Sequence, residues 1–193
     1  MNRDDKATCR QVLRAARQDM GNRDAAGRAI WNRLRDQPEW TTARSLLLYV
    51  DVRGEVPTRD ALQEELMQER RRVALPWCDG DELRAVLIQS TNELKPGRFG
   101  IPEPIPAIRN LNDREMRAAD FDLIIIPAVG FDRRGQRLGS GRGYYDRFLA
   151  SASPQTCLCG IGFDCQLVDV VPTEPHDRRM DLIVTESQVL RFA

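Results

Sequence analysis

Two short apolar runs constrain the fold of this chain more than any other feature. They are SLLLYV (residues 45–50) and DLIII (residues 122–126). Uninterrupted runs of this length are typical of strands that are buried on both faces of a sheet. Pro127 follows the second run and cannot donate to a strand ladder, so we expect the central strand to end at Ile126.

Further apolar runs and helical patterns alternate along the rest of the chain. More strands are expected at residues 72–78, 83–88, 156–163 and 181–186. Helices are expected at residues 5–20, 24–36 and 59–70 and over the segment YYDRFLA. This alternation predicts an α/β fold, a three-layer αβα sandwich around a mostly parallel central sheet, as a single domain over residues 1–193.

Proline, glycine and capping residues set the expected ends of these elements. Pro38 ends the second helix, and Thr58 is expected as the N-cap of the helix at 59–70. Residues 90–110 are rich in proline and glycine, so we expect a shaped loop that holds no regular helix.

The charge balance and the cysteine content narrow the class of protein. The 193 residues include 29 Lys and Arg and 29 Asp and Glu, so the formal net charge is zero, which argues against a dedicated nucleic-acid binder. No apolar stretch approaches the ~20 residues of a membrane span, and the N-terminus lacks the apolar core of a secretory signal. The five cysteines are odd in number, so we expect a reduced cytoplasmic protein. For the oligomeric state, a monomer is the default expectation.

The strongest candidate site is a segment with glycine at alternate positions, Gly139, Gly141 and Gly143. Glycine adopts positive φ and lets an anion approach the backbone, so successive N–H groups can point into one concavity. The helical pattern that begins after Gly143 adds the partial positive charge of a helix N-terminus. The bare GxGxG pattern fits a tight packed turn equally well, so its flanking residues decide the interpretation.

Those flanking residues favour a nucleotide. Arg137 and Arg142 have guanidinium groups that can clamp phosphate oxygens. Asp146 offers the hard oxygen ligand that magnesium prefers. Ligands of parallel sheets bind beyond the carboxyl ends of strands, and both the turn after residues 45–50 and the loop after residues 122–126 lie there.

The segment from Phe131 to Asp146 resembles the signature of the 5-formyltetrahydrofolate cyclo-ligase family, also called 5,10-methenyltetrahydrofolate synthetases. That signature has the form Phe-Asp-x-x-Gly-x-Arg-Leu-Gly-x-Gly-x-Gly-Tyr/Phe-Tyr-Asp, and every fixed position matches. Further landmarks of the family occur in order along the chain: Lys6 and Arg10, Glu55 and Thr58, Gly100-Ile101-Pro102-Glu103-Pro104, Gln166-Leu167, Pro172, His176-Asp177, and Asp181.

The resemblance implies an ATP- and Mg²⁺-dependent enzyme of folate one-carbon metabolism. Enzymes of this family close 5-formyltetrahydrofolate to 5,10-methenyltetrahydrofolate and release ADP and phosphate. The formyl oxygen is phosphorylated, N10 attacks the activated carbon, and phosphate leaves. Phosphorylation suits this chemistry because it turns a poor leaving group into a good one, so the protein mainly aligns the reactants and neutralises charge.

The resemblance also implies roles for residues by position. The ATP-binding residues would be Lys6, Arg10, Arg137, Leu138, Gly139, Ser140, Gly141, Arg142, Gly143, Tyr144 and Tyr145. The folate-binding residues would be Val50, Glu55, Ser140, Gly141, Arg142, Gly143 and Tyr144. Asp146 and Asp181 would be the magnesium ligands, and Arg142 and Tyr144 would be catalytic. The Glu55 carboxylate can accept hydrogen bonds from pterin N–H groups, and either Tyr144 or Tyr145 could stack on a flat ring.

Two other functions remain open at this stage. The expected fold is shared by sugar-phosphate isomerases and acyl-CoA transferases, and fold does not fix function. Those enzymes need neither the pair Lys6 and Arg10 nor two magnesium-type aspartates. A non-catalytic folate- or nucleotide-binding relative would keep the glycines but lose Glu55 or Asp181, and both are present.

Several single residues allow two interpretations. His176 either acts as a base or orders its own loop, and Glu103 either lines a pocket or shapes the proline-rich loop. Cys157, Cys159, Cys165 and His176 lack the ligand spacing of a zinc site, so buried thiols are expected instead.

Overall fold

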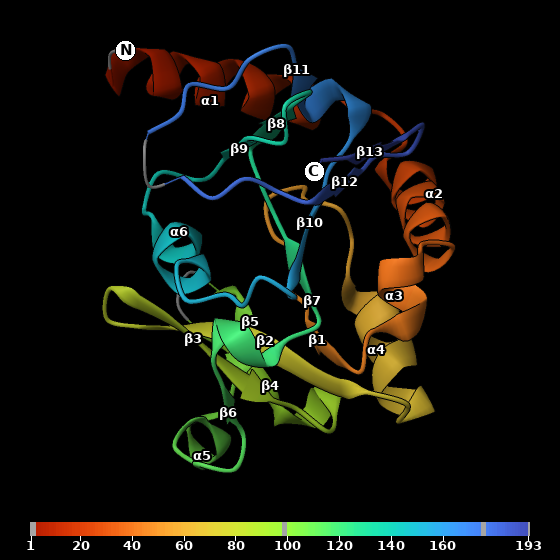
Figure 1. Cartoon of the computed structure of the whole chain (residues 1–193), viewed down its shortest axis with the longest axis vertical. Coiled ribbons are helices and arrows are strands. Elements are labelled where there is room, and N and C mark those ends of the chain that lie inside the picture. The colour runs from red at the N-terminus through yellow and green to blue at the C-terminus, as the bar shows by residue number, and fades with distance from the viewer. Residues whose placement is uncertain (1–2, 98–99, 175–176, 193) are drawn as a thin grey trace.

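The computed structural model describes residues 3–97, 100–174 and 177–192 (Figure 1). Its α-helices are α1 (Arg3–Gln18), α2 (Arg23–Arg35), α3 (Pro38–Thr42), α4 (Arg59–Gln68), α5 (Pro106–Arg109) and α6 (Tyr144–Leu149). Short 3-10 helices are η1 (Thr91–Glu93), η3 (Ala118–Asp120) and η4 (Asp164–Gln166). None of the helices in these ranges is both long and apolar enough to cross a bilayer.

A large mixed sheet forms the centre of the molecule. Its strands, in spatial order, are β13 (Val189–Arg191), β12 (Leu182–Val184), β10 (Cys157–Ile161), β7 (Leu123–Ile126), β1 (Ser45–Leu47), β2 (Arg72–Asp79), β3 (Glu82–Leu87) and β6 (Glu115–Met116). The five inner strands from β12 to β2 are parallel, whereas β13, β3 and β6 pair antiparallel at the edges. The predicted α/β fold with a mostly parallel sheet is confirmed.

Alternate residues of the inner strands pack into two separate cores. On one face, Leu46 and Ile125 pack with Ile30 and Trp31 of α2 and with residues of α3 and α4. On the other face, Ile124 and its neighbours pack with α6 and η3. In Figure 1, α2, α3 and α4 accordingly lie on one side of the sheet and α6 on the other. The layers are unequal, because α6 has only 6 residues.

Two small sheets are made of short strands that the apolar runs did not predict. One consists of β11 (Leu167–Val168), β8 (Gly130–Asp132) and β9 (Arg137–Leu138), and the other of β4 (Leu94–Pro96) and β5 (Pro102–Pro104). The prediction that residues 90–110 hold no regular helix was wrong. Pro106 begins α5, because proline is well tolerated at the first position of a helix.

Other predicted elements exist with shifted ends. β1 stops at Leu47, and beyond it the carbonyl of Tyr49 accepts a hydrogen bond from the Thr58 hydroxyl at 2.6 Å. Within the strand expected at 181–186, only Leu182–Val184 form a strand, β12. Within the strand expected at 156–163, only Cys157–Ile161 do, as β10. Pro38, predicted only to end the second helix, also begins α3.

Asp122 fixes how the two central strands begin. Its Oδ2 accepts hydrogen bonds from the backbone N–H groups of Arg44 and Ser45, at 2.7 and 3.0 Å, and from the Ser45 hydroxyl at 3.0 Å. The Asp122 N–H donates in return to the Ser45 Oγ at 2.9 Å. Burial alone would raise the pKa of Asp122, but these hydrogen bonds lower it below its ordinary value.

We expect Asp122→Ala to lower the free energy of unfolding by about 1–2 kcal/mol at pH 7, because three donors lose one charged acceptor. The lowered pKa means that this stabilisation is present above the unfolded-state pKa and is lost as the pH falls through the native value. Urea unfolding of both proteins at pH 7 and pH 3 measures the difference. The exposed Asp113→Ala serves as the control, and an equal effect of the two substitutions would contradict the prediction.

Candidate functional site

A cleft of about 280 Å³ opens beyond the carboxyl ends of β1, β2 and β7, the edge that the sequence predicted for a ligand. The loop after β1 contributes Val50 and Glu55, and β2 contributes Trp77 and Cys78. The glycine-rich segment forms another part of the wall, through the lining residues Arg137, Gly139, Ser140, Arg142, Gly143, Tyr144, Tyr145 and Asp146. The two segments that the sequence singled out therefore meet at one site.

The glycine-rich loop has the backbone that its sequence predicts. Gly141 and Gly143 have φ of 103° and 68°, which side chains with a Cβ rarely adopt. A Cβ at Gly141 would also lie 3.3 Å from the Arg10 Cζ. The turn therefore favours glycine at this position, and the Arg10 side chain of α1 passes close to it. Because the following helix α6 has only one and a half turns, its dipole adds little to the charge of the loop.

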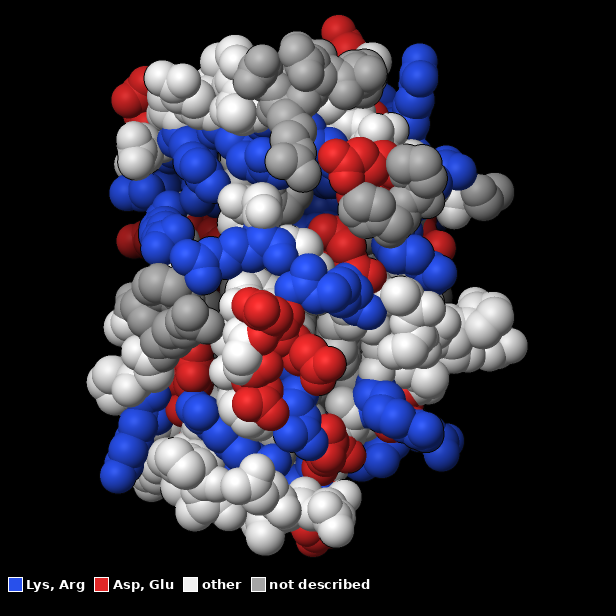
Figure 2. All heavy atoms as spheres, turned by 90° about the vertical axis from the view of Figure 1, so that its left-hand side faces the viewer, with Lys and Arg blue, Asp and Glu red and all other residues white. Residues whose placement is uncertain are grey.

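One face of α1 attaches to this loop through arginine side chains. The Arg10 Nε donates to the Gly139 carbonyl at 2.9 Å, and the Arg14 Nη2 reaches the Ser140 carbonyl at 3.4 Å. Figure 2 shows that lysine and arginine side chains form a band across this side of the molecule. The loop therefore lies in a strongly cationic environment although the whole chain has no net charge.

Arg17 continues the same face of α1 into the protein. Only 6% of this residue is exposed. Its Nη1 donates to the Ala128 carbonyl at 3.3 Å and its Nη2 to the Arg53 carbonyl at 3.0 Å. Arg17 thereby joins the loop after β7 to the loop after β1. Sequence reasoning missed this residue, although the spacing of Arg10, Arg14 and Arg17 places all three on one helical face.

Glu55 is held in the cleft wall by a tight turn. Its N–H donates to the Val52 carbonyl at 3.0 Å, and its Oε2 accepts the Val52 N–H at 3.2 Å. Arg53 and Gly54 inside the turn both have positive φ, 52° and 76°. Burial raises the pKa of Glu55 to about 7, although the Val52 hydrogen bond and the nearby Arg17 oppose that rise.

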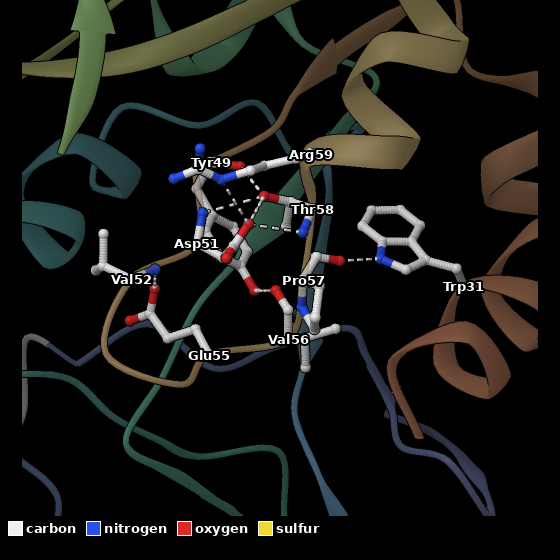
Figure 3. A network of polar contacts seen from close by, with 9 residues as sticks. All are labelled: Trp31, Tyr49, Asp51, Val52, Glu55, Val56, Pro57, Thr58 and Arg59. Atoms are coloured by element: carbon white, nitrogen blue, oxygen red, sulfur yellow. Dashed lines mark hydrogen bonds and ion pairs between the residues drawn. The ribbon is translucent and has the colours of Figure 1, made fainter. Parts of the chain in front are cut away.

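Thr58 anchors the far end of the same loop (Figure 3). It occupies the N-cap position of α4 as predicted, but its side chain makes no capping hydrogen bond. Its hydroxyl instead accepts the Asp51 N–H at 3.1 Å, and the Asp51 Oδ1 accepts the Thr58 N–H at 2.9 Å. The Trp31 indole donates to the Pro57 carbonyl at 2.5 Å. The loop that presents Glu55 is therefore fixed before any ligand binds.

Arg137 and Asp146 form an ion pair in the cleft, with the Arg137 Nη2 and the Asp146 Oδ1 2.5 Å apart. The Arg137 side chain is 4% exposed and that of Asp146 is 19% exposed. The guanidinium also lies 5.6 Å from the centre of the Tyr145 ring. Arg137 thus helps to build the cleft wall, whereas the exposed Arg142 is the more accessible cation of the loop.

Unpartnered polar atoms gather at this cleft. In the described ranges, the buried side-chain atoms without a hydrogen-bond partner are the Nε atoms of Arg17, Arg33 and Arg137, the Glu65 Oε2 and the Tyr145 Oη. Arg17, Arg137 and Tyr145 all line the cleft. Because folded proteins rarely leave buried polar atoms unpaired, this concentration points to a polar ligand.

Five predicted site residues do not line the cleft: Lys6, Arg10, Leu138, Gly141 and Asp181. Leu138 is a buried residue of β9, and Lys6 pairs with Asp177 at 2.9 Å. Asp181 comes just before β12, at the amino ends of the parallel strands, whereas the cleft lies at their carboxyl ends. Its Oδ2 accepts the Leu158 N–H at 2.8 Å. Arg10 donates to the Gly139 carbonyl and does not point its charge into the cleft. A shared magnesium site of Asp146 and Asp181 therefore stays a prediction that their positions do not favour.

The residues with two interpretations have different outcomes. Glu103 both lines the cleft and pairs with Arg109 at 3.0 Å, so it serves the pocket and the loop together. Cys159 is fully buried, as expected for a core thiol. His176 lies outside the described residues. Within the described ranges, no group of three or more His, Cys, Asp or Glu side chains is arranged to hold a metal ion.

The chain is similar to known proteins over nearly its whole length. Residues 2–186 match the 5-formyltetrahydrofolate cyclo-ligase family. The 5-formyltetrahydrofolate cyclo-ligase of Escherichia coli (strain K12) is 31% identical over 176 residues, which cover 89% of this chain and 91% of that protein. The enzyme of the same name from Mycolicibacterium smegmatis is 33% identical over 149 residues, which cover 75% of this chain and 74% of that protein.

A solved structure has the same fold. The NMR structure of Aquifex aeolicus 5,10-methenyltetrahydrofolate synthetase superposes with a TM-score of 0.83 at 29% sequence identity. The match covers 96% of this chain and 92% of that chain. Together with the sequence relatives, it confirms the resemblance that the motifs indicated.

The raised pKa of Glu55 predicts a pH dependence of stability. Between the ordinary pKa of 4.5 and about 7, the native state keeps a proton that the unfolded state has lost, so the contribution of Glu55 to stability falls as the pH rises. We expect Glu55→Gln to gain on the order of 1–2 kcal/mol relative to the wild type between pH 5 and pH 8. Urea unfolding at both pH values measures this gain, with the exposed Glu82→Gln as the control. A stability difference that does not change with pH would contradict the prediction.

Proposed function

Because this chain belongs to the 5-formyltetrahydrofolate cyclo-ligase family, we propose that it closes 5-formyltetrahydrofolate to 5,10-methenyltetrahydrofolate with ATP as co-substrate. One observation carries the proposal: a single cleft is lined both by Val50 and Glu55 and by the glycine-rich loop. Groups suited to a flat heterocycle and groups suited to a triphosphate thus border the same space, as transfer of a phosphoryl group between the two substrates requires.

The nucleotide would bind on the cationic side of the cleft. Arg14 and Arg142 contribute charge beside the open backbone of Gly139–Gly143. Backbone N–H groups and guanidinium groups are the usual partners of phosphate oxygens. Arg10 would act mainly through its hydrogen bond to the Gly139 carbonyl, which orients the loop.

The folate would bind on the side of the cleft formed by β1 and β2. Val50, Trp77 and Ile101 offer apolar surface to a ring, and Glu55 offers an acceptor to its N–H groups. A carboxylate with a pKa near 7 can bind such donors in its charged form above that pH. Their place in the cleft wall supports the substrate roles that the family motif implies for Val50 and Glu55.

The proposed reaction has two steps. The formyl oxygen attacks the γ-phosphorus of ATP, the bond to the bridging oxygen breaks, and ADP leaves with that electron pair. N10 next attacks the formyl carbon, phosphate leaves with the C–O electron pair, and the N10 proton is lost. Arg142 would neutralise charge on the transferred group, and Tyr144 lines the same cleft.

In this proposal Asp146 would hold Mg²⁺ beside the phosphates. Its Oδ1 is paired with Arg137, and in the described part of the chain its Oδ2 has no hydrogen-bond partner. Magnesium in nucleotide sites usually takes one or two carboxylates together with phosphate oxygens and water, so a single aspartate fits. When bound, the ion would neutralise phosphate charge.

The direct test mixes the purified protein with 5-formyltetrahydrofolate and MgATP and follows the near-ultraviolet absorbance of the methenyl product. We expect Arg142→Gln to raise the KM for ATP about tenfold and Glu55→Gln to raise the KM for the folate by a similar factor, because each loses one charged contact. The exposed Arg133→Gln is the control. No product from folded protein would overturn the proposal, and equal effects on both KM values would overturn the division of the cleft.

A magnesium titration of the same activity tests the metal ligands. We expect Asp146→Asn to move the midpoint to higher Mg²⁺ concentration, because a neutral amide is a weaker ligand than a carboxylate. Asp181→Asn tests the second ligand that the family motif implies. An unchanged midpoint would remove the corresponding residue from the metal site.

A further inference from the structure

The hydroxyl of Tyr145 has no hydrogen-bond partner among the described residues, although its ring packs against the core. The ring packs against the core on the α6 side of the sheet, and the Arg137 guanidinium lies 5.6 Å from its centre. The Oη atom is buried and makes no hydrogen bond in the described structure. Tyr49, a buried tyrosine that also lines the cleft, donates its hydroxyl to the Val56 carbonyl at 3.1 Å. The Tyr145 hydroxyl is therefore available to a ligand in a way that the Tyr49 hydroxyl is not.

The neighbours of this hydroxyl define what it can bind. Tyr145, Glu55, Cys78 and Arg137 all line the cleft. Burial raises the pKa of Tyr145 far above its ordinary value, and the nearby charge of Glu55 raises it further against the opposing effect of Arg137. The phenol consequently keeps its proton and offers a donor, whereas Glu55 offers an acceptor.

A donor and an acceptor on the wall of one cleft can bind a cyclic amide edge, in which a carbonyl oxygen and an N–H group occupy adjacent ring positions. The pterin ring of a reduced folate carries such an edge. We propose that Tyr145 determines specificity for this edge, donating its hydroxyl to the ring carbonyl while Glu55 accepts the adjacent N–H. This inference rests on the folate substrate proposed above, and it assigns Tyr145 to the folate rather than to ATP.

Two variants separate a hydroxyl that serves the ligand from one that serves the fold. Tyr145→Phe removes no internal hydrogen bond, so we expect its Tm to equal or exceed that of the wild type. Tyr49→Phe leaves the Val56 carbonyl without its donor, so we expect its Tm to fall by a few degrees. A fall in Tm for Tyr145→Phe as large as that for Tyr49→Phe would overturn the inference, because it would reveal an internal partner.

Binding of two folates without ATP locates the contact. 5-Formyltetrahydrofolate and 5-methyltetrahydrofolate share the ring carbonyl, but only the first has a formyl oxygen. By isothermal titration calorimetry, we expect Tyr145→Phe to weaken both folates about tenfold and to leave the affinity for ATP unchanged. Weakening of the formyl compound alone would place the hydroxyl at the formyl group, and weakening of ATP alone would place it on the nucleotide. Either result, or no weakening at all, would overturn the inference.

The same experiment distinguishes failure of the inference from failure of the proposed function. Wild-type protein that binds both folates through Tyr145 but forms no methenyl product would refute the cyclisation and retain the contact. Wild-type protein that forms product, with unchanged folate binding in Tyr145→Phe, would refute the contact alone. Wild-type protein that binds neither folate would refute both.

Discussion

The site depends on one buried guanidinium that links two loops. Arg17 donates to the carbonyls of Arg53 and Ala128, which follow β1 and β7 respectively. A parallel sheet brings the ends of these strands together, but it does not fix the loops beyond them. A buried charge is costly unless it is hydrogen-bonded, so the two carbonyls and the guanidinium hold one another in place. That link holds the loop after β1 and the loop after β7 together.

The cleft also concentrates features that are unfavourable in a folded protein. Glu55 sits in a turn with two residues of positive φ, and burial raises its pKa. Among the residues that the structure describes, the Nε atoms of Arg17 and Arg137 and the hydroxyl of Tyr145 are buried and have no hydrogen-bond partner. Each feature costs stability in the free protein, and together they occur where the stable sheet ends. Such concentration of unfavourable features is common at functional sites, because a ligand can satisfy them.

The sequence predicted the parts of this molecule that depend on local pattern. The apolar run at 122–126 defined β7, and the alternate glycines predicted a backbone with positive φ, which Gly141 and Gly143 have. β8 and β9 have three and two residues, too few for any period to be visible. Arg17 and Asp181 depend on tertiary position: an arginine at helical spacing is normally solvated, and an aspartate before a strand can serve a backbone N–H as readily as a metal ion.

Helix α1 has an unusual attachment to the rest of the protein. Leu13 is its main buried apolar side chain, while Arg10, Arg14 and Arg17 bind carbonyl oxygens of the loops. The helix thus contributes much to the walls of the cleft and little to the two cores of the sheet. The shape of the cleft and the stability of the sheet consequently depend on different parts of the chain. Substitutions on the arginine face of α1 would therefore change ligand binding before they changed the stability of the fold.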